Sequence, residues 1–182
     1  MKNRDFRYSA LFLDRDGVIN KRIVNAYVTM PSEFVFLPGV LEAIKLCSEH
    51  FRFIFIVTNQ QGVGRGLMTE EQLNNVHLYM LKEINKHGGR IDKVFFCPHR
   101  ADDNCTCRKP KTGMFVQAKE KFSLIDEKTS VMVGDTLSDM MFGKNCGLKN
   151  VLISEDIQTD LETLKLADFQ FSSLFQFAKH FV

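Results

Sequence analysis

The sequence YSALFLDRDGVIN, residues 8–20, joins a largely apolar run to two acidic residues. The run from Tyr8 to Leu13 is rich in aromatic and aliphatic side chains, which is typical of a parallel β-strand covered on both faces. It ends at Asp14, and Asp16 follows two positions later. Gly17 then permits a sharp backbone turn, which would bring both carboxylates to one opening. Taken alone, the pattern also fits an ordinary Asp-Gly turn.

Similar apolar runs alternate with helical patterns along the rest of the chain. Further strands are predicted at residues 51–57, 94–97, 131–133 and 151–153. The clearest helical pattern begins at Thr69, whose spacing to Gln72 is that of a capping box, and ends at Gly88. This alternation predicts an α/β fold of three layers, an open Rossmann-like parallel sheet with helices on both faces. We expect a single domain over residues 1–182, with no large cap domain.

Charge and hydrophobicity argue against nucleic acids and membranes as binding partners. The 182 residues include 24 Lys and Arg against 22 Asp and Glu, a net charge of +2, which argues against a dedicated nucleic-acid binder. No apolar run is long enough for a membrane span, and the first one ends too early for a signal peptide. The aromatic segment 174–181 has helical spacing, and a helix docked on the core is favoured over a membrane or partner anchor. We expect a cytoplasmic monomer.

Four acidic residues follow two of the predicted strands. Asp14 and Asp16 follow the first, while Asp135 and Asp139 follow the run at residues 131–133. Because the carboxyl ends of parallel strands meet at one edge of a sheet, these carboxylates would repel one another without a cation. Mg²⁺ fits such a site, since it prefers hard oxygen ligands and keeps positions open for water and phosphate.

Groups suited to phosphate lie near the same predicted edge. Thr58 and Asn59 close the second strand and offer a hydroxyl and an amide. Arg108 and Lys109 add fixed positive charge, which stabilises a transferring phosphoryl group. A carboxylate such as Asp14 can attack a phosphoryl group, and a second acid can move the protons.

These segments occur in the order of the four motifs of the haloacid dehalogenase superfamily of phosphatases. DRDGVIN, the strand ending in TN, RKP and VGDTLSD extend over most of the chain, which therefore resembles that superfamily. The resemblance implies that Asp14 is the nucleophile and Asp16 the general acid and base. It implies that Thr58 and Lys109 steady the phosphoryl oxygens. It also implies the Mg²⁺ ligands and one supporting acid: Asp14, the Asp16 carbonyl and Asp135, with Asp139 in support.

A cluster of cysteine and histidine lies just before RKP. Cys97, His99, Cys105 and Cys107 fall within eleven residues and match the ligand set of a four-coordinate, structural zinc ion. The alternative is three buried thiols and a surface histidine, but the polar RADDN between them argues against burial. The sequence therefore predicts a zinc-pinned loop that fixes the backbone of the RKP motif. Cys47 and Cys146 are interpreted as core thiols.

Within the superfamily, the CPH…CTCRKPKTGM pattern after TNQQGVGRG is similar to the D,D-heptose 1,7-bisphosphate phosphatases. The histidinol-phosphate phosphatases share the zinc pattern and remain the alternative. The heptose resemblance implies removal of one phosphate, at C7, from a sugar bisphosphate. Arg108 is then a substrate-recognition residue, and Asn59 and Arg65 are further candidates; Arg65 could also be a solvated loop arginine.

Two features depart from the heptose pattern: residues 21–26, KRIVNA, form a longer loop, and Thr136 stands where the family often has lysine. From a different class, a zinc-bound interaction module with an inactive site remains open, although the intact Asp14 and Asp16 argue against it. The four other histidines are assigned no chemistry; they are His50, His77, His87 and His180.

Overall fold

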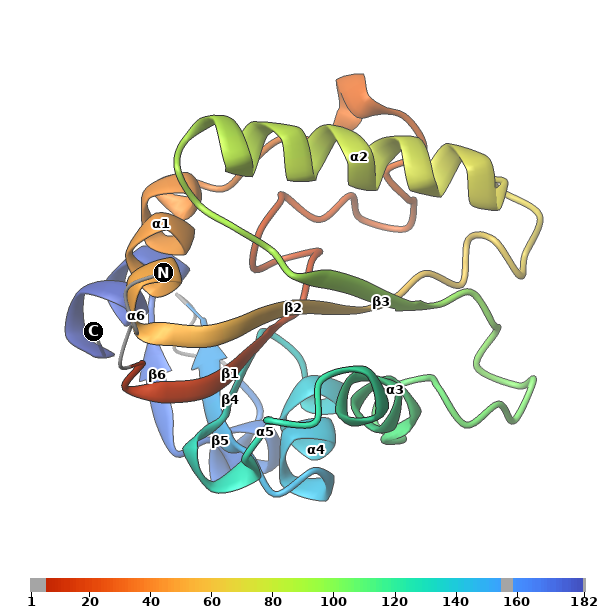
Figure 1. The fold of residues 1–182 in the computed structure, drawn as a ribbon. Coiled ribbons are helices and arrows are strands. Elements are labelled where there is room, and N and C mark those ends of the chain that lie inside the picture. Colours follow the sequence, from red (N-terminus) through yellow and green to blue (C-terminus); the bar gives the residue numbers. More distant parts are fainter. Residues whose placement is uncertain (1–5, 155–158, 182) are drawn as a thin grey trace.

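Six parallel strands form the sheet at the centre of the protein (Figure 1). The structure, a computed structural model, describes residues 6–154 and 159–181. The strand order is β3-β2-β1-β4-β5-β6, and all neighbouring strands are parallel. The strands are β1 (Tyr8–Leu13), β2 (Phe51–Asn59), β3 (Lys93–Cys97), β4 (Val131–Gly134), β5 (Lys149–Ile153) and β6 (Phe169–Phe171). This order confirms the predicted Rossmann-like α/β fold.

Helices cover both faces of the sheet (Figure 1). They are α1 (Val40–His50), α2 (Glu70–Lys86), α3 (Gly113–Lys121), α4 (Leu137–Asn145), α5 (Leu161–Leu166) and α6 (Leu174–Phe181), with 3₁₀ turns at Pro31–Glu33 and Glu127–Thr129. Side chains of α1, α2 and α6 share one buried cluster with the sheet, and those of α3 and α4 share the other. The predicted three layers are confirmed, and the described residues include no large cap domain.

The first strand shows why the sheet needs cover on both faces. Leu11 and Leu13 belong to the core under α1, α2 and α6, whereas Ala10 and Phe12 belong to the core over α3 and α4. All four side chains are fully buried. Alternate residues of a strand point to opposite faces, so an unbroken apolar run can only be satisfied by two apolar layers.

Helix α2 has the boundaries that its sequence predicts. The Thr69 hydroxyl accepts a hydrogen bond from the Gln72 backbone N–H at 3.1 Å, and the Gln72 side chain accepts one from the Thr69 N–H at 2.8 Å. This reciprocal pair is the capping box, which satisfies two backbone donors that a helix start leaves unpaired. The buried stripe of the helix includes Val76, His77 and Met80. Gly88, with φ of 83°, follows its end.

Strand β6 and helix α5 were not predicted from the sequence. The terminal segment does form a docked helix, because Leu174, Phe177 and Ala178 of α6 are buried in the core shared with α1. Strand β2 is longer than expected and includes Thr58 and Asn59. Among the described residues, no helix combines the length and the apolar character required to traverse a lipid bilayer.

The middle of the sheet places the acidic residues together. Strands β1 and β4 are neighbours, yet the chain leaves β1 toward α1 and leaves β4 toward α4, on opposite faces. Asp14 follows β1 and Asp135 follows β4, so both lie at the point where the strand order reverses. In open α/β sheets this point leaves a crevice between the loops, which is where ligands bind.

Candidate active site

Lys109 lies between two carboxylates at this crevice. Its ammonium Nζ donates to Asp14 Oδ1 at 2.7 Å, to Asp139 Oδ1 at 2.5 Å and to the Val57 carbonyl at 2.7 Å. All three charged side chains are buried, and Lys109 is only 3% exposed. Buried charges are tolerated when they are paired and hydrogen-bonded, as they are here. The ammonium is therefore held at a fixed place beside Asp14.

The environment shifts the proton affinities of this triad. Burial raises the pKa of Asp14 to about 6, although the Lys109 charge opposes the shift. Burial by itself would lower the pKa of Lys109, but the carboxylates of Asp139 and Asp14 raise it above its ordinary range. Lys109 therefore stays positively charged, and its charge offsets part of the effect of burial on the pKa of Asp14.

Asp139 is held by both the lysine and the start of α4. Its Oδ2 accepts from the Thr136 N–H at 3.1 Å and from the Thr136 hydroxyl at 2.5 Å. A Cβ added at Gly134 would lie 2.2 Å from the Asp139 Cβ, so only glycine fits at the end of β4. The other oxygen of Asp139 is left to contact Lys109, and its supporting role in catalysis stays a prediction.

The Asp16 carboxylate is held by three neighbouring side chains. Its Oδ1 accepts from Arg15 Nη2 at 3.0 Å and from Asn20 Nδ2 at 2.9 Å, and its Oδ2 accepts from Gln60 Nε2 at 2.7 Å. Burial tends to raise the pKa of Asp16, but the Arg15 charge and these hydrogen bonds hold it below its ordinary value. Asp16 thus rests as a carboxylate, the form that accepts a proton. Sequence reasoning did not find Arg15, Asn20 or Gln60.

The two residues predicted at the end of β2 differ in their surroundings. The Thr58 hydroxyl is buried and accepts from Gln60 Nε2 at 2.8 Å. Asn59 braces the backbone of Lys109: its Oδ1 accepts from the Lys109 N–H at 3.0 Å, and its Nδ2 donates to the Lys109 carbonyl at 3.2 Å. Both the oxygen and the nitrogen of the Asn59 side-chain amide therefore already have hydrogen-bond partners. Its contact with substrate stays a prediction.

Arg22, which no motif marked, lies on the atoms predicted to bind Mg²⁺. Its Nη2 donates to both oxygens of Asp135 at 2.9 Å and to the Asp16 carbonyl at 2.7 Å. The residue belongs to the 21–26 loop in which the chain departs from the heptose pattern. The Asp135 carboxylate is thus paired with the guanidinium of Arg22. Burial, followed by the nearby Asp14 charge, raises the pKa of Asp135 to about 8 despite this contact.

The donors at this point suit a small divalent cation. Oxygens of Asp14, Asp135 and Asp139 lie within 4.8 Å of one another. Gly17, with φ of 103°, leaves the space, because a Cβ there would lie 2.0 Å from Asp135 Oδ2. Hard carboxylate and carbonyl oxygens with an open side are what Mg²⁺ prefers. The residues present therefore fit the predicted ion.

A cavity of about 480 Å³ opens over these groups. Its floor includes Asp14, Asp16, Thr58 and Lys109, and its rim comes from loops. Five cationic side chains line it: Arg15, Arg22, Arg65, Arg108 and Lys109. The cavity is thus acidic where a cation would bind and basic around it, which suits a small, strongly anionic ligand.

The rim loops are packed closely on one another. A Cβ at Gly62 would lie 2.9 Å from the Tyr27 ring, and a Cβ at Gly64 would lie 2.7 Å from the Pro98 carbonyl oxygen. The Gly64 N–H donates to that same oxygen at 2.9 Å. These glycines let the loop carrying Arg65 lie directly against its two neighbours. Arg65 itself is exposed and lines the cavity.

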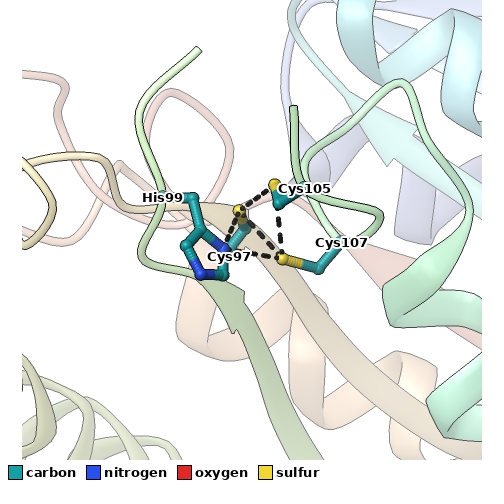
Figure 2. Close-up of side chains that lie close together, drawn as sticks. All are labelled: Cys97, His99, Cys105 and Cys107. Carbon is teal, nitrogen blue, oxygen red and sulfur yellow. Dashed lines mark hydrogen bonds between the residues drawn. The ribbon is translucent and has the colours of Figure 1, made fainter. Parts of the chain in front are cut away.

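The predicted zinc ligands converge at the end of β3 (Figure 2). The Cys107 Sγ lies 3.1 Å from Cys97 Sγ and 3.6 Å from Cys105 Sγ, and His99 Nδ1 lies 3.2 Å from Cys107 Sγ. A tetrahedral ion with Zn–S bonds of about 2.3 Å needs sulfurs roughly 3.8 Å apart. The Cys105 sulfur lies near that separation, 3.6 Å from each of the other two, whereas Cys97 and Cys107 lie closer together. Three thiols and one imidazole are also the donor types that zinc prefers.

The thiols differ in their readiness to ionise. Burial raises the pKa of Cys97 above its ordinary range. At Cys105 the weak burial is outweighed by hydrogen bonds, the first from the Arg108 N–H, and its pKa falls to about 7. Thiolates are the form that binds metal. Cys47 and Cys146 are buried, as predicted for core thiols.

Comparisons with known proteins identify relatives of this chain. A family model described as HAD-hydrolase-like matches residues 106–174. The D-glycero-alpha-D-manno-heptose-1,7-bisphosphate 7-phosphatase of Campylobacter jejuni is 43% identical over 148 residues, covering 81% of this chain and 83% of that protein. The D-glycero-beta-D-manno-heptose-1,7-bisphosphate 7-phosphatase of Helicobacter pylori is 35% identical, covering 88% and 93% of the two chains.

A solved structure has the same fold over nearly the whole chain. The D,D-heptose 1,7-bisphosphate phosphatase from B. bronchiseptica, complexed with magnesium and phosphate, superposes with a TM-score of 0.82 at 32% identity. The match covers 95% of this chain and 97% of that chain.

Proposed function

We propose that this chain, which belongs to the haloacid dehalogenase-like family of D-glycero-manno-heptose-1,7-bisphosphate 7-phosphatases, hydrolyses the C7 phosphate of D-glycero-D-manno-heptose 1,7-bisphosphate. The carrying observation is the Lys109 ammonium held between Asp14 and Asp139 beneath a cavity lined by arginines. A sugar bisphosphate offers one phosphate to the floor of this cavity and a second to its basic rim.

In the proposed mechanism Asp14 is the nucleophile. Lys109 holds Asp14 Oδ1, and the other oxygen attacks phosphorus. Because Asp16 rests as a carboxylate, it first takes up a proton from solvent. As the new O–P bond forms, the bond from phosphorus to the C7 oxygen breaks, and Asp16 gives that oxygen the proton. Water then attacks the aspartyl-phosphate and passes its proton to Asp16, which frees inorganic phosphate and the Asp14 carboxylate. Lys109 and the Thr58 hydroxyl stabilise the charge on the phosphoryl oxygens.

Asp14, the Asp16 carbonyl and Asp135 would hold Mg²⁺ in this site. The ion supplies positive charge that offsets the repulsion between these acids and the substrate phosphate. A carboxyl group must be ionised to serve as a metal ligand. Because the pKa values of Asp14 and Asp135 are raised, to about 6 and about 8, binding of the ion should release protons and weaken as the pH falls.

Arg22 competes with Mg²⁺ for Asp135, so the first prediction concerns metal affinity. We expect Arg22→Ala to tighten Mg²⁺ binding by about 5-fold, because a bidentate pair with a half-exposed arginine is worth on the order of 1 kcal/mol. Titration calorimetry of the metal-free protein measures it. The control is Lys21→Ala, which removes a neighbouring exposed cation without a contact to Asp135. Unchanged or weaker binding by Arg22→Ala would contradict the competition.

The zinc-pinned loop is proposed to aim the cations of RKP, since Cys107 directly precedes Arg108 and Lys109. We expect Cys105→Ser to lose zinc and to lower kcat/KM by roughly 10-fold to 100-fold, although it removes no group that touches substrate. Elemental analysis and phosphate release measure the two effects. Thr106→Ser, an exposed change between the two cysteines, is the control. Full zinc content together with full activity in Cys105→Ser would refute the role of the loop.

Three broader features complete the proposal. Residues 1–182 act as one domain, since helices and strands of the described residues share the two faces of one sheet. The enzyme works as a monomer in the cytoplasm. Arg65 and Arg108 bind the distal phosphate of the substrate, supported by their places on the cavity rim.

A phosphate-release panel tests the substrate. It contains both anomers of heptose 1,7-bisphosphate, fructose 1,6-bisphosphate, histidinol phosphate and 4-nitrophenyl phosphate, each with Mg²⁺. We expect the highest kcat/KM for one of the heptose anomers. A highest value for histidinol phosphate would overturn the substrate while leaving the mechanism intact. Absence of turnover on every compound would restore the inactive-module alternative.

A further inference from the structure

Arg15 is a buried arginine next to the two catalytic carboxylates. It is 1% exposed, although arginine is almost never fully buried unless it is paired. Its Nη2 donates to Asp16 Oδ1 at 3.0 Å and to Gln60 Oε1 at 3.2 Å, and its Nη1 donates to His77 Nε2 at 3.1 Å. One side of the guanidinium therefore faces the active site, and the other faces α2.

Gln60 extends this contact to the rest of the site. Its Oε1 accepts from Arg15, while its Nε2 donates to Asp16 Oδ2 at 2.7 Å and to the Thr58 hydroxyl at 2.8 Å. An arginine can only donate, so it fixes which end of the Gln60 amide faces it. Arg15 and Gln60 together hold both oxygens of Asp16, and they set the direction of its carboxyl plane.

His77 is the far end of the network and comes from the buried stripe of α2. Burial, followed by the Arg15 charge, lowers its pKa to about 3, so the ring is neutral. Because Arg15 donates, Nε2 must be the unprotonated nitrogen. The ring also packs beside Phe96 of β3, with ring centroids 5.8 Å apart. A neutral acceptor held by packing fixes the guanidinium without adding charge.

We propose that His77 is a positioning residue for the proton transfer by Asp16, acting through Arg15 and Gln60. The inference rests on the role of Asp16 in the proposed function. Without the acceptor on α2, the buried Nη1 lacks this partner and the guanidinium turns toward other acceptors. Asp16 then loses a fixed orientation, although neither its charge nor the nucleophile is altered. A histidine that only fills the core would have no such selective effect.

The test separates leaving groups. The alkoxide of a sugar needs a proton as it departs, whereas 4-nitrophenolate is stable without one. We expect His77→Leu to lower kcat for the fastest sugar phosphate of the panel by about 10-fold to 100-fold, and for 4-nitrophenyl phosphate by less than about 3-fold. Asp16→Asn should give the same selectivity with a larger loss. His77→Gln, whose amide oxygen can accept from Arg15, should restore most of the activity.

Two further variants separate positioning from damage to the fold. Val76→Ala opens a small cavity in the same buried stripe and should affect both substrates equally. His77→Asn is a smaller change, with an amide too short to reach Arg15, and should repeat the leucine result if His77→Leu does not fold. Equal losses on both substrates in the His77 variants, or none, would overturn the inference. Equal losses in Asp16→Asn would instead show that the proton-transfer role itself is wrong.

Discussion

Asp14→Asn is expected to abolish phosphate release, with a loss of at least about 10⁴-fold in kcat. The amide nitrogen that replaces one oxygen is not a nucleophile, so no aspartyl-phosphate can form. The fold should be retained, because burial already disfavours the charged form of this carboxyl and the amide carries no charge. Lys109 also keeps its contact with Asp139. Phosphate release and thermal unfolding measure the two effects.

The control for this result is Glu120→Gln, which makes the same chemical change on an exposed side chain of α3. Intact-protein mass spectrometry of the wild type, quenched during turnover, should reveal one added phosphoryl group that Asp14→Asn lacks. If Asp14→Asn keeps more than about a hundredth of the activity, the nucleophile lies elsewhere.

Lys109→Met is expected to produce the largest loss of stability, about 3–5 kcal/mol in the metal-free protein. The variant leaves Asp14 and Asp139 buried without their cation. The loss should depend on pH. The pKa of Asp14 in the folded wild type, about 6, already exceeds its ordinary value of 3.8, and removal of Lys109 raises it further. A raised pKa favours folding below pH 3.8 and loses that contribution as the pH rises through the folded value.

Urea unfolding at pH 5 and pH 8, with a chelator present, measures this dependence. The difference between wild type and Lys109→Met should be larger at pH 8. Lys121→Met, at an exposed position, should change stability by less than about 0.5 kcal/mol at either pH. A loss of that small size in Lys109→Met would show that the buried ion pairs contribute little.

The sequence predicts the elements whose structure is decided by residues close together in the chain, such as β1 and the start of α2. The apolar run before Asp14 needs two covering layers wherever it folds, and the capping box at Thr69 starts a helix from neighbouring residues alone. The short strand β6 was missed, because it lies at the edge of the sheet, and its Phe169 is exposed rather than buried. Its apolar pattern therefore carries little signal.

The same distinction separates the predicted site residues from those that were missed. Asp14, Asp135 and Lys109 stand in motifs whose spacing carries information. Arg22 meets Asp135 across 113 positions, and His77 meets Arg15 across 62. Such partners are set by the packing of a loop or a helix onto the sheet, so no local pattern around His77 indicates its contact with Arg15. Only the assembled fold makes these contacts visible.

The glycines beneath the cavity rim constrain how this enzyme can change its substrate. Gly62 fits against Tyr27, and Gly64 fits against Pro98 beside the zinc ligands. The three loops that carry Tyr27, Gly62 and Pro98 around the cavity are therefore packed directly against one another. None can take a larger side chain at these contacts without displacing a neighbouring loop. Substrate selectivity should therefore depend on all three loops at once. Engineering a new substrate preference would require exchanging the three loops together rather than grafting one.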